Sequence, residues 1–142
     1  SKRMIGNKRH AALLIPYYVK EGRVFVFLQR RSKNAKMYSD KISYFGGGID
    51  EGESAEEAMK REIKEELTFD ASGAIYFGKF EYPDAVKNVF YLEVPEDFER
   101  QIEVREGQYG RFYSEEEALN EPDIIDSTRS ELPSFFDRIN NL

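Results

Sequence analysis

The chain has 142 residues, of which 40% are hydrophobic and 14% aromatic, and it contains no cysteine. Its length and apolar content predict one folded domain over residues 1–142, and the lack of cysteine excludes disulfide bonds and thiol catalysis. The formal net charge of -6 disfavours binding to extended nucleic acid, which usually needs a basic stripe of side chains.

The N-terminal third of the chain predicts a β-hairpin. Residues 10–18 and 23–29 are rich in β-branched, aromatic and aliphatic side chains, and a turn at residues 20–22 separates them. A polar loop is expected at residues 34–40, followed by a short strand at residues 42–45.

The next segment combines a glycine-rich turn with a helix. Residues 45–49 contain three consecutive glycines, which let the backbone approach a ligand because glycine has no Cβ. Ser54 is a favourable N-cap and Glu57 completes a capping box. We therefore expect a helix from Ser54 to about Leu67.

The C-terminal half predicts further strands and helices. The expected elements are strands at residues 74–82, 87–94 and 110–113, a short helix at residues 115–119, and a helix from Ser130 through Asn140 with Pro133 in its first turn. This order lacks the regular strand–helix alternation of a doubly wound fold, although it still belongs to the α/β class.

Nothing in the chain predicts membrane insertion or export. The apolar runs, such as residues 11–15, are far too short to span a bilayer. The basic start at residues 1–9 lacks the pattern of a signal peptide, so we expect a frayed end or a lead into the first strand. These features predict a soluble, cytoplasmic protein.

Three carboxylates occupy the helix face that should be apolar. At about 100° per residue, Glu62, Glu65 and Glu66 share one arc with Ala58 and Met59. Glu62 and Glu66 also form a like-charge pair four residues apart, which a positive charge should compensate. Oxygen ligands without nearby histidine or cysteine suit Mg²⁺ or Mn²⁺ and disfavour zinc. The alternative is a salt-bridged surface helix after a flexible loop.

The whole segment resembles the signature box of the Nudix hydrolases. Gly47, Glu53 and the run Arg61-Glu62-Ile63-Lys64-Glu65-Glu66-Leu67 stand at the offsets of the family pattern Gly-x5-Glu-x7-Arg-Glu-U-x-Glu-Glu-x-Gly-U, where U is a bulky apolar residue. Thr68 replaces the second glycine, so a different helix C-cap is expected there. The resemblance implies an α/β/α sandwich with a mixed β-sheet.

The resemblance also implies roles for the residues of the box. The metal-binding groups would be Gly47, through its carbonyl, and Glu53, Glu62, Glu65 and Glu66, through their carboxylates. Arg61 would orient the carboxylates through bidentate hydrogen bonds. For Glu53 and Arg61, the alternative is an ion pair that staples the loop, which is compatible with an active site.

A second segment resembles MutT-type members of the family. It reads Glu106-Gly107-Gln108, a spacer, Gly110, a spacer, and then Phe112. In such proteins the glutamate reaches the metal or acts as a base, so Glu106 is a candidate catalytic residue. The alternative is a solvated loop glutamate. The general base stays open between Glu106 and Glu65.

Candidate substrate-binding residues lie upstream of the box. Arg30 and Arg31 suit the distal phosphates of a nucleotide, or else mark a solvated strand end. Tyr44 suits stacking on a base, or else packs in the core.

The resemblance implies metal-dependent hydrolysis of a diphosphate linkage in a small nucleotide. The first expectation is a nucleoside triphosphate that yields a monophosphate and pyrophosphate. ADP-ribose, nucleotide sugars and dinucleoside polyphosphates are alternatives within the enzyme class. A catalytically silent nucleotide-binding module is the alternative outside that class. The sequence leaves the oligomeric state open.

Overall fold

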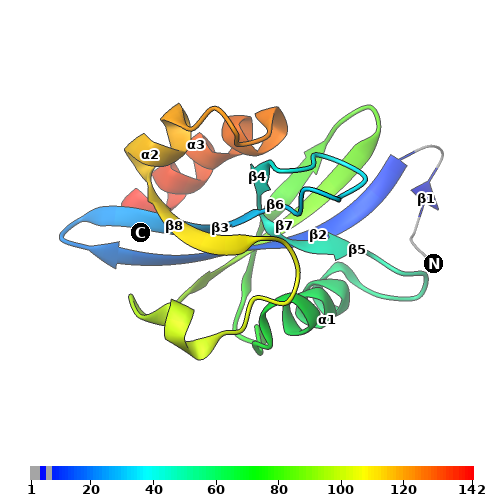
Figure 1. Ribbon diagram of the computed structural model, residues 1–142, viewed down its shortest axis with the longest axis horizontal. Helices are drawn as coiled ribbons and strands as arrows, with labels where there is room; N and C mark the ends of the chain where they lie inside the picture. The colour runs from blue at the N-terminus through cyan, green and yellow to red at the C-terminus, as the bar shows by residue number, and fades with distance from the viewer. Residues whose placement is uncertain (1–3, 6–7) are drawn as a thin grey trace.

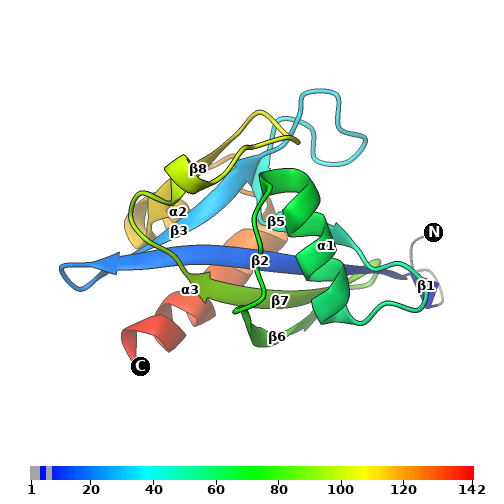
Figure 2. The ribbon, with the colours of Figure 1, turned by 90° about the horizontal axis from the view of Figure 1, so that it is seen from below.

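A long strand, β2 (Lys8–Lys20), organises the sheet around which the chain folds. The computed structural model describes residues 4–5 and 8–142. In chain order its elements are β1 (Met4–Ile5), β2 (Lys8–Lys20), β3 (Arg23–Arg30), β4 (Ile42–Ser43), β5 (Phe45–Gly48), α1 (Ala55–Leu67), β6 (Ile75–Glu81), β7 (Ala85–Glu93), η1 (Phe98–Gln101), β8 (Tyr109–Ser114), α2 (Glu115–Asn120) and α3 (Asp126–Asn140). Figures 1 and 2 show β2 crossing the middle of the molecule.

Strands β2 and β3 begin as a hairpin and then diverge. Residues 17–20 of β2 pair with residues 23–26 of β3 in antiparallel register, which confirms the predicted hairpin. Further along, residues 11–14 of β2 pair with β5, whereas the end of β3 pairs with β4. The segment from β4 to β5 therefore fills a fork between the two strands.

The other edges complete a mixed sheet. β7 pairs with β2 in parallel, β6 pairs with β7 in antiparallel register, and β8 pairs with β3 in antiparallel register. Helix α1 covers one face of this sheet, and α2 and α3 cover the other (Figure 1). The expected α/β/α sandwich with a mixed sheet is confirmed.

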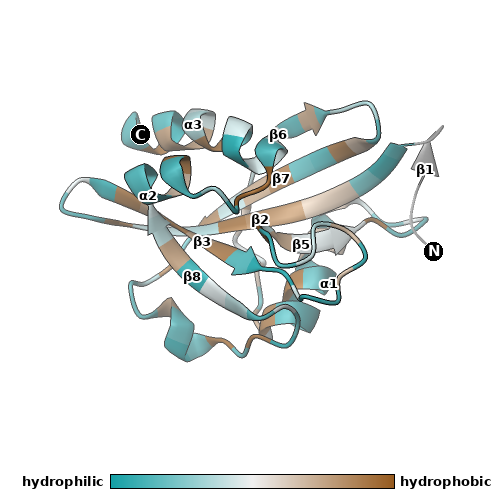
Figure 3. Ribbon diagram, turned by 45° about the horizontal axis from the view of Figure 1, so that its top comes forward, coloured by the Kyte–Doolittle hydropathy of each residue, from teal (hydrophilic) through white to brown (hydrophobic). Residues whose placement is uncertain are grey.

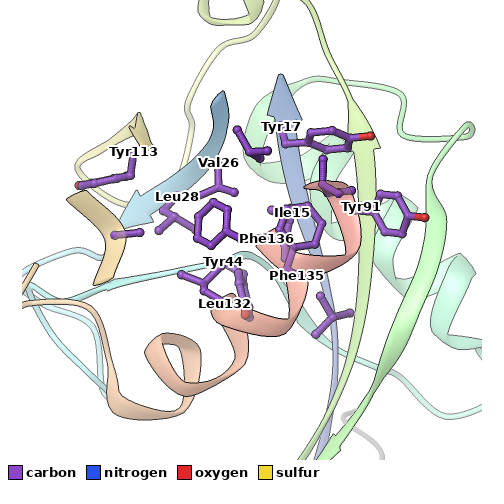
Figure 4. Close-up of a cluster of buried hydrophobic side chains, with 14 of the residues drawn as sticks. Ile15, Tyr17, Val26, Leu28, Tyr44, Tyr91, Tyr113, Leu132, Phe135 and Phe136 are labelled. Carbon is purple, nitrogen blue, oxygen red and sulfur yellow. The ribbon is translucent and has the colours of Figure 1, made fainter. Parts of the chain in front are cut away.

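Alternation along the strands builds a separate core on each face. In β2, Ala12 and Leu14 pack in the cluster under α1, whereas Ile15 and Tyr17 pack in the cluster under α3. Figure 4 shows the second cluster, to which α3 contributes Phe135 and other residues. Figure 3 shows hydrophobic residues along the middle of β2, between the two clusters, and hydrophilic residues over much of α2 and α3.

Helix α1 begins as predicted. The Ser54 hydroxyl accepts a hydrogen bond from the Glu57 amide at 3.0 Å, and the Glu57 carboxylate accepts one from the Ser54 amide at 2.9 Å. This capping box satisfies two amides that have no partner inside the helix. The helix ends at Leu67, also as predicted.

The prediction of a turn at residues 45–49 was wrong, because three of its glycines lie in strand β5. Gly46 has φ +129° and lies against β2, where an added Cβ would collide with the Ala12 carbonyl oxygen. Glycine permits this close approach of two backbones. The strand predicted at residues 42–45 is divided at Tyr44 into β4 and β5.

The start of the C-terminal helix was also predicted wrongly. Helix α3 begins at Asp126, so Pro133 lies in its interior and not in its first turn. The N-cap is Ile125, whose side chain makes no capping hydrogen bond, and the Arg129 amide already donates to the Ile125 carbonyl at 3.0 Å. Packing of Leu132, Phe135 and Phe136 in the core offsets the hydrogen bond that proline cannot donate.

The other predicted elements lie within two residues of their predicted bounds, whereas β1 and η1 were not predicted as separate elements. The expectation for residues 1–9 falls partly on residues 1–3 and 6–7, which lie outside the described residues. Among residues 4–5 and 8–142, no helix has both the length and the apolar character that a bilayer span requires.

Candidate functional site

Arg61 is the hub of the loop between β5 and α1. Its Nε and Nη2 atoms donate to the two carboxylate oxygens of Glu53 at 2.7 and 2.9 Å, and Nη2 also donates to the Gly48 carbonyl at 3.1 Å. The Nη1 atom donates to Glu62 at 2.9 Å. The hydrogen bond to Glu53, followed by the contacts with Glu62, raises the pKa of Arg61 further above its usual range. Arg61 thus ties the loop to the helix and fixes one oxygen of Glu62.

Glu62 lies directly against the backbone of Gly47. A Cβ added at Gly47 would be 2.5 Å from the Glu62 carboxyl carbon and 2.6 Å from its Oε2 atom. Any side chain at position 47 would therefore displace the carboxylate. Because Gly47 has no side chain, its backbone and the Glu62 carboxylate lie close enough to bind the same ligand.

Glu66 is a buried carboxyl group without a positive partner. Only 3% of the residue is exposed, and its Oε1 atom accepts a hydrogen bond from the Gly46 amide at 3.0 Å. Within the described part of the chain, no lysine or arginine forms an ion pair with it. Burial raises the pKa of Glu66 to about 9, with the Glu62 and Glu106 carboxylates adding to the rise and the Gly46 amide opposing it. The site is therefore short of positive charge.

These residues fit a hard divalent cation. The available ligand atoms are carboxylate and carbonyl oxygens. Glu62 occupies the space left by the missing side chain of Gly47, and the Glu66 carboxylate needs a positive charge beside it to ionise. The ligand set is not closed in this conformation, since no three acidic, histidine or cysteine side chains of the described residues converge on one point. Glu65 is 52% exposed and lies 3.6 Å from Arg61, and Glu53 is turned toward Arg61.

The carboxylates line an open cleft of about 1520 Å³. The part lined by Glu62, Glu65, Glu66 and Glu106, together with Gly47 and Gln29, is called here the carboxylate end. The lining also includes Tyr82, Lys87 and residues 125–128 at the start of α3. The cleft is large enough for a nucleotide, because ligand pockets typically span about 300 to 1,000 Å³.

The two predicted arginines differ in their surroundings. Arg30 is not among the residues that line the cleft. Its guanidinium instead donates to the Tyr109 hydroxyl at 2.8 Å, the Asp40 carbonyl at 2.8 Å and an Asp123 oxygen at 3.1 Å. It joins three segments of the chain and is only 16% exposed. Arg31 does line the cleft, and it has no carboxylate within ion-pairing distance among residues 4–5 and 8–142.

Tyr44 belongs to the core beneath the cleft. The residue is 3% exposed and its ring packs in the cluster under α3 (Figure 4). Burial raises the pKa of its hydroxyl well above the usual value, and the Glu131 carboxylate adds to the rise. Tyr44 also lines the cleft, but with so little of the residue exposed, its surroundings agree better with core packing, the other predicted alternative, than with stacking on a base.

Sequence reasoning missed a buried polar cluster around Glu131. Lys87 Nζ donates to Ser127 Oγ at 2.7 Å and to Glu131 Oε1 at 3.3 Å, and the Tyr82 hydroxyl also donates to Glu131. Burial lowers the pKa of Lys87, and Glu131 opposes this change. The available signal was a lysine at the start of the apolar strand predicted at residues 87–94.

Thr68 keeps the backbone conformation that a glycine would favour. Its φ of +55° and ψ of +44° are left-handed, and its amide donates to the Lys64 carbonyl at 3.0 Å. The expected change in C-cap is therefore wrong: the helix ends in the left-handed geometry, at the cost of strain in a β-branched residue.

Known proteins share both the sequence pattern and this architecture. The NUDIX domain family matches residues 8–133 of the chain. An 8-oxo-dGTP diphosphatase from Haemophilus influenzae is 35% identical over 85 residues, which cover 58% of this chain and 61% of that protein. An 8-oxo-dGTP diphosphatase from Escherichia coli is 34% identical over 91 residues, which cover 63% of this chain and 69% of that protein.

A solved structure agrees over nearly the full length. The crystal structure of a mutT/nudix family protein from Listeria innocua superposes with a TM-score of 0.78 and 26% identity, covering 98% of this chain and 97% of that one. The family match extends far beyond the box, from the first half of β2 into α3. The chain therefore belongs to the Nudix hydrolase family.

Proposed function

We propose that residues 1–142 form one catalytic domain that hydrolyses a phosphoanhydride bond in a small nucleotide. The first candidate substrate is a nucleoside triphosphate, which would yield a monophosphate and pyrophosphate. The observation that carries the proposal is the buried Glu66, which forms no ion pair with a described lysine or arginine and lies near Glu62 and Gly47 in the lining of a cleft of nucleotide size.

The proposed cofactor is Mg²⁺, with Mn²⁺ as a substitute. Nudix hydrolases typically need a divalent metal ion. Glu62, Glu66 and the Gly47 carbonyl would hold it, and Glu65 is the nearest further carboxylate on the same helix. When bound, the ion supplies positive charge that offsets the phosphate oxygens and makes a water molecule more acidic.

The chain's own residues orient groups and move protons. Arg61 holds Glu62 and Glu53 in fixed positions. Glu65 and Glu106 both line the cleft and are exposed, which supports either carboxylate as the candidate that takes the proton from the attacking water. Arg31 offers a cation for the negative charge on the phosphates.

The relatives suggest which base to test first. Both are named 8-oxo-dGTP diphosphatases, so 8-oxo-dGTP and dGTP are the first pair of substrates to compare. The fold supports several substrate classes, so the panel also includes ADP-ribose, a nucleotide sugar and a dinucleoside polyphosphate.

A product-release assay with this panel and Mg²⁺ tests the proposal. We expect turnover of at least one nucleoside triphosphate, and a loss of about 100-fold or more in kcat for Glu66→Gln and for Glu65→Gln. Glu56→Gln, on the solvent side of α1, is the matched control and should retain activity. Silence over the whole panel would instead favour a nucleotide-binding module without catalysis.

A further inference from the structure

A buried glutamine at the end of β3 has no role in the proposed chemistry. Gln29 is 5% exposed and lines the carboxylate end of the cleft. Its Nε2 atom donates to the backbone carbonyl of Glu106 at 3.1 Å. A buried side-chain amide needs a hydrogen-bond partner, and the partner of Gln29 is the backbone of Glu106, the candidate catalytic residue.

The turn formed by Glu106, Gly107 and Gln108, called here the Glu106 turn, is fitted closely to the end of β3. Gly107 has φ +82°, and a Cβ added there would be 2.8 Å from Gln29 Nε2 and 2.9 Å from the Arg30 carbonyl oxygen. The Gln108 amide donates to the same Arg30 carbonyl at 2.8 Å. Two backbone positions and one buried side chain therefore fix this turn.

The segment before the turn is bound to the end of helix α1. The Arg105 amide donates to the Glu66 carbonyl at 2.8 Å, and the Glu103 amide donates to the Leu67 carbonyl at 3.0 Å. Residues 103–108 thus bridge the C-terminus of α1 and the end of β3. Glu106 stands in this bridge and lines the same cleft as Glu62 and Glu66.

Gln108 extends the bridge to the loop at residues 31–41. Its Nε2 atom donates to the Arg31 carbonyl at 2.9 Å and to Asp40 Oδ1 at 2.6 Å. The wall of the cleft that carries Arg31 is therefore attached to the turn that carries Glu106.

We infer that Gln29 and Gln108 are positioning residues that hold Glu106 at the carboxylate end of the cleft. The inference rests on the proposed function and deepens it. Neither glutamine is required to touch the substrate in this role. Their effect passes through the Glu106 backbone, so it should disappear when the Glu106 carboxylate is removed.

A double-mutant cycle tests this dependence. Gln29→Met keeps the length of the side chain but removes the donor, and we expect kcat to fall by about tenfold with KM changed by less than about threefold. In the Glu106→Gln background, the same substitution should change kcat by less than about twofold. Gln108→Ala is the second variant and should behave alike. Gln101→Met, an exposed glutamine in η1 outside the cleft, is the matched control.

Hydrogen exchange gives a readout that needs no turnover. The Gln108 amide should exchange about tenfold faster in Gln29→Met than in the wild type, because the turn is released from β3. Equal exchange, or kcat effects that add in the Glu106→Gln background, would overturn the inference. If the wild type is inactive but the exchange result is as expected, the proposed function is rejected, while the attachment of the Glu106 turn by Gln29 remains supported.

Discussion

Arg61 donates hydrogen bonds to both carboxylate oxygens of Glu53, at 2.7 Å from Nε to Oε2 and 2.9 Å from Nη2 to Oε1. The remaining Nη1 atom reaches Glu62 at 2.9 Å. A planar guanidinium can make these contacts together, whereas the single ammonium group of lysine cannot. The geometry of the β5–α1 loop and the orientation of Glu62 therefore depend on one side chain.

Arg61→Lys should lower both stability and activity. We expect a loss of about 1–3 kcal/mol in the free energy of unfolding by urea, and at least a tenfold fall in kcat. Arg105→Lys is the matched control, since the Arg105 guanidinium lies 3.6 Å from Glu103 with both side chains exposed, and it should change stability by less than about 1 kcal/mol. Equal effects of the two substitutions would show that the Arg61 contacts contribute no more to stability and activity than an exposed ion pair does.

Gly47→Ala should lower activity by about 100-fold in a folded protein. The new Cβ would lie 2.5 Å from the Glu62 carboxyl carbon, so the carboxylate must move away from the Gly47 backbone. A displacement of this size at a reacting centre costs about 100-fold in rate. Gly78→Ala is the control, because an added Cβ meets no atom of the described residues within 4 Å there. Circular dichroism would verify that both variants fold, and a Gly47→Ala protein as active as the wild type would contradict the proposed site.

Thr68→Gly should stabilise the protein. Thr68 has φ +55°, a conformation that costs a residue with a Cβ about 1–2 kcal/mol, while glycine loses about 0.5–1 kcal/mol more entropy on folding. The expected net gain is therefore about 0.5–1 kcal/mol in urea unfolding. Thr68→Ala retains a Cβ and should gain less. Destabilisation by glycine would mean that the threonine side chain makes a compensating contact.

Glu66 should make the stability of the metal-free protein depend on pH. Burial, aided by Glu62 and Glu106, raises the pKa of Glu66 from its ordinary value of 4.5 to about 9. Between these values the folded chain holds a proton that the unfolded chain releases, so the free energy of unfolding falls as pH rises. The contribution is fully present below pH 4.5 and is lost as pH passes through the folded-state pKa.

Thermal unfolding in the presence of a chelator measures this dependence. Between about pH 6 and about pH 8.5, the unfolding temperature should fall by several degrees more in the wild type than in Glu66→Gln. Saturating Mg²⁺ should reduce the fall in the wild type, because a cation stabilises the charged carboxylate. Identical pH profiles for the two proteins would contradict the assigned pKa.

The features that could be predicted from the sequence depend on local hydrogen bonds. Ser54 and Glu57 are three residues apart and determine the start of α1 by themselves. The hairpin of β2 and β3 also follows from neighbouring segments. Helix α3 lacks such a signal, because Ile125 cannot cap and Pro133 resembles a residue of the first turn.

Other features depend on contacts between distant residues. Nothing near the three glycines indicates that Gly46 pairs with Leu13, so the local sequence predicts a turn where the structure has β5. Gln29 contacts a carbonyl 77 residues away, and Glu131 binds Tyr82 across 49 residues. The box is an intermediate case: its spacing predicted which carboxylates share a helix face, and the resemblance implied that Arg61 orients carboxylates, with a Glu53–Arg61 ion pair as the alternative. The structure shows Arg61 in contact with both Glu53 and Glu62.

The fork between β2 and β3 separates two parts of the cleft. β5 takes its register from β2, which places Gly47 relative to helix α1, whereas β4 takes its register from β3. The loop at residues 31–41 leaves and rejoins the sheet at a closed neck, where the Arg31 amide donates to the Lys41 carbonyl at 2.7 Å. Changes in the length or composition of this loop can therefore reshape the side of the cleft that carries Arg31 without shifting Gly47 against Glu62. In terms of the proposed function, this loop can alter how a substrate is held while the contact between Gly47 and Glu62 in the proposed metal site is kept.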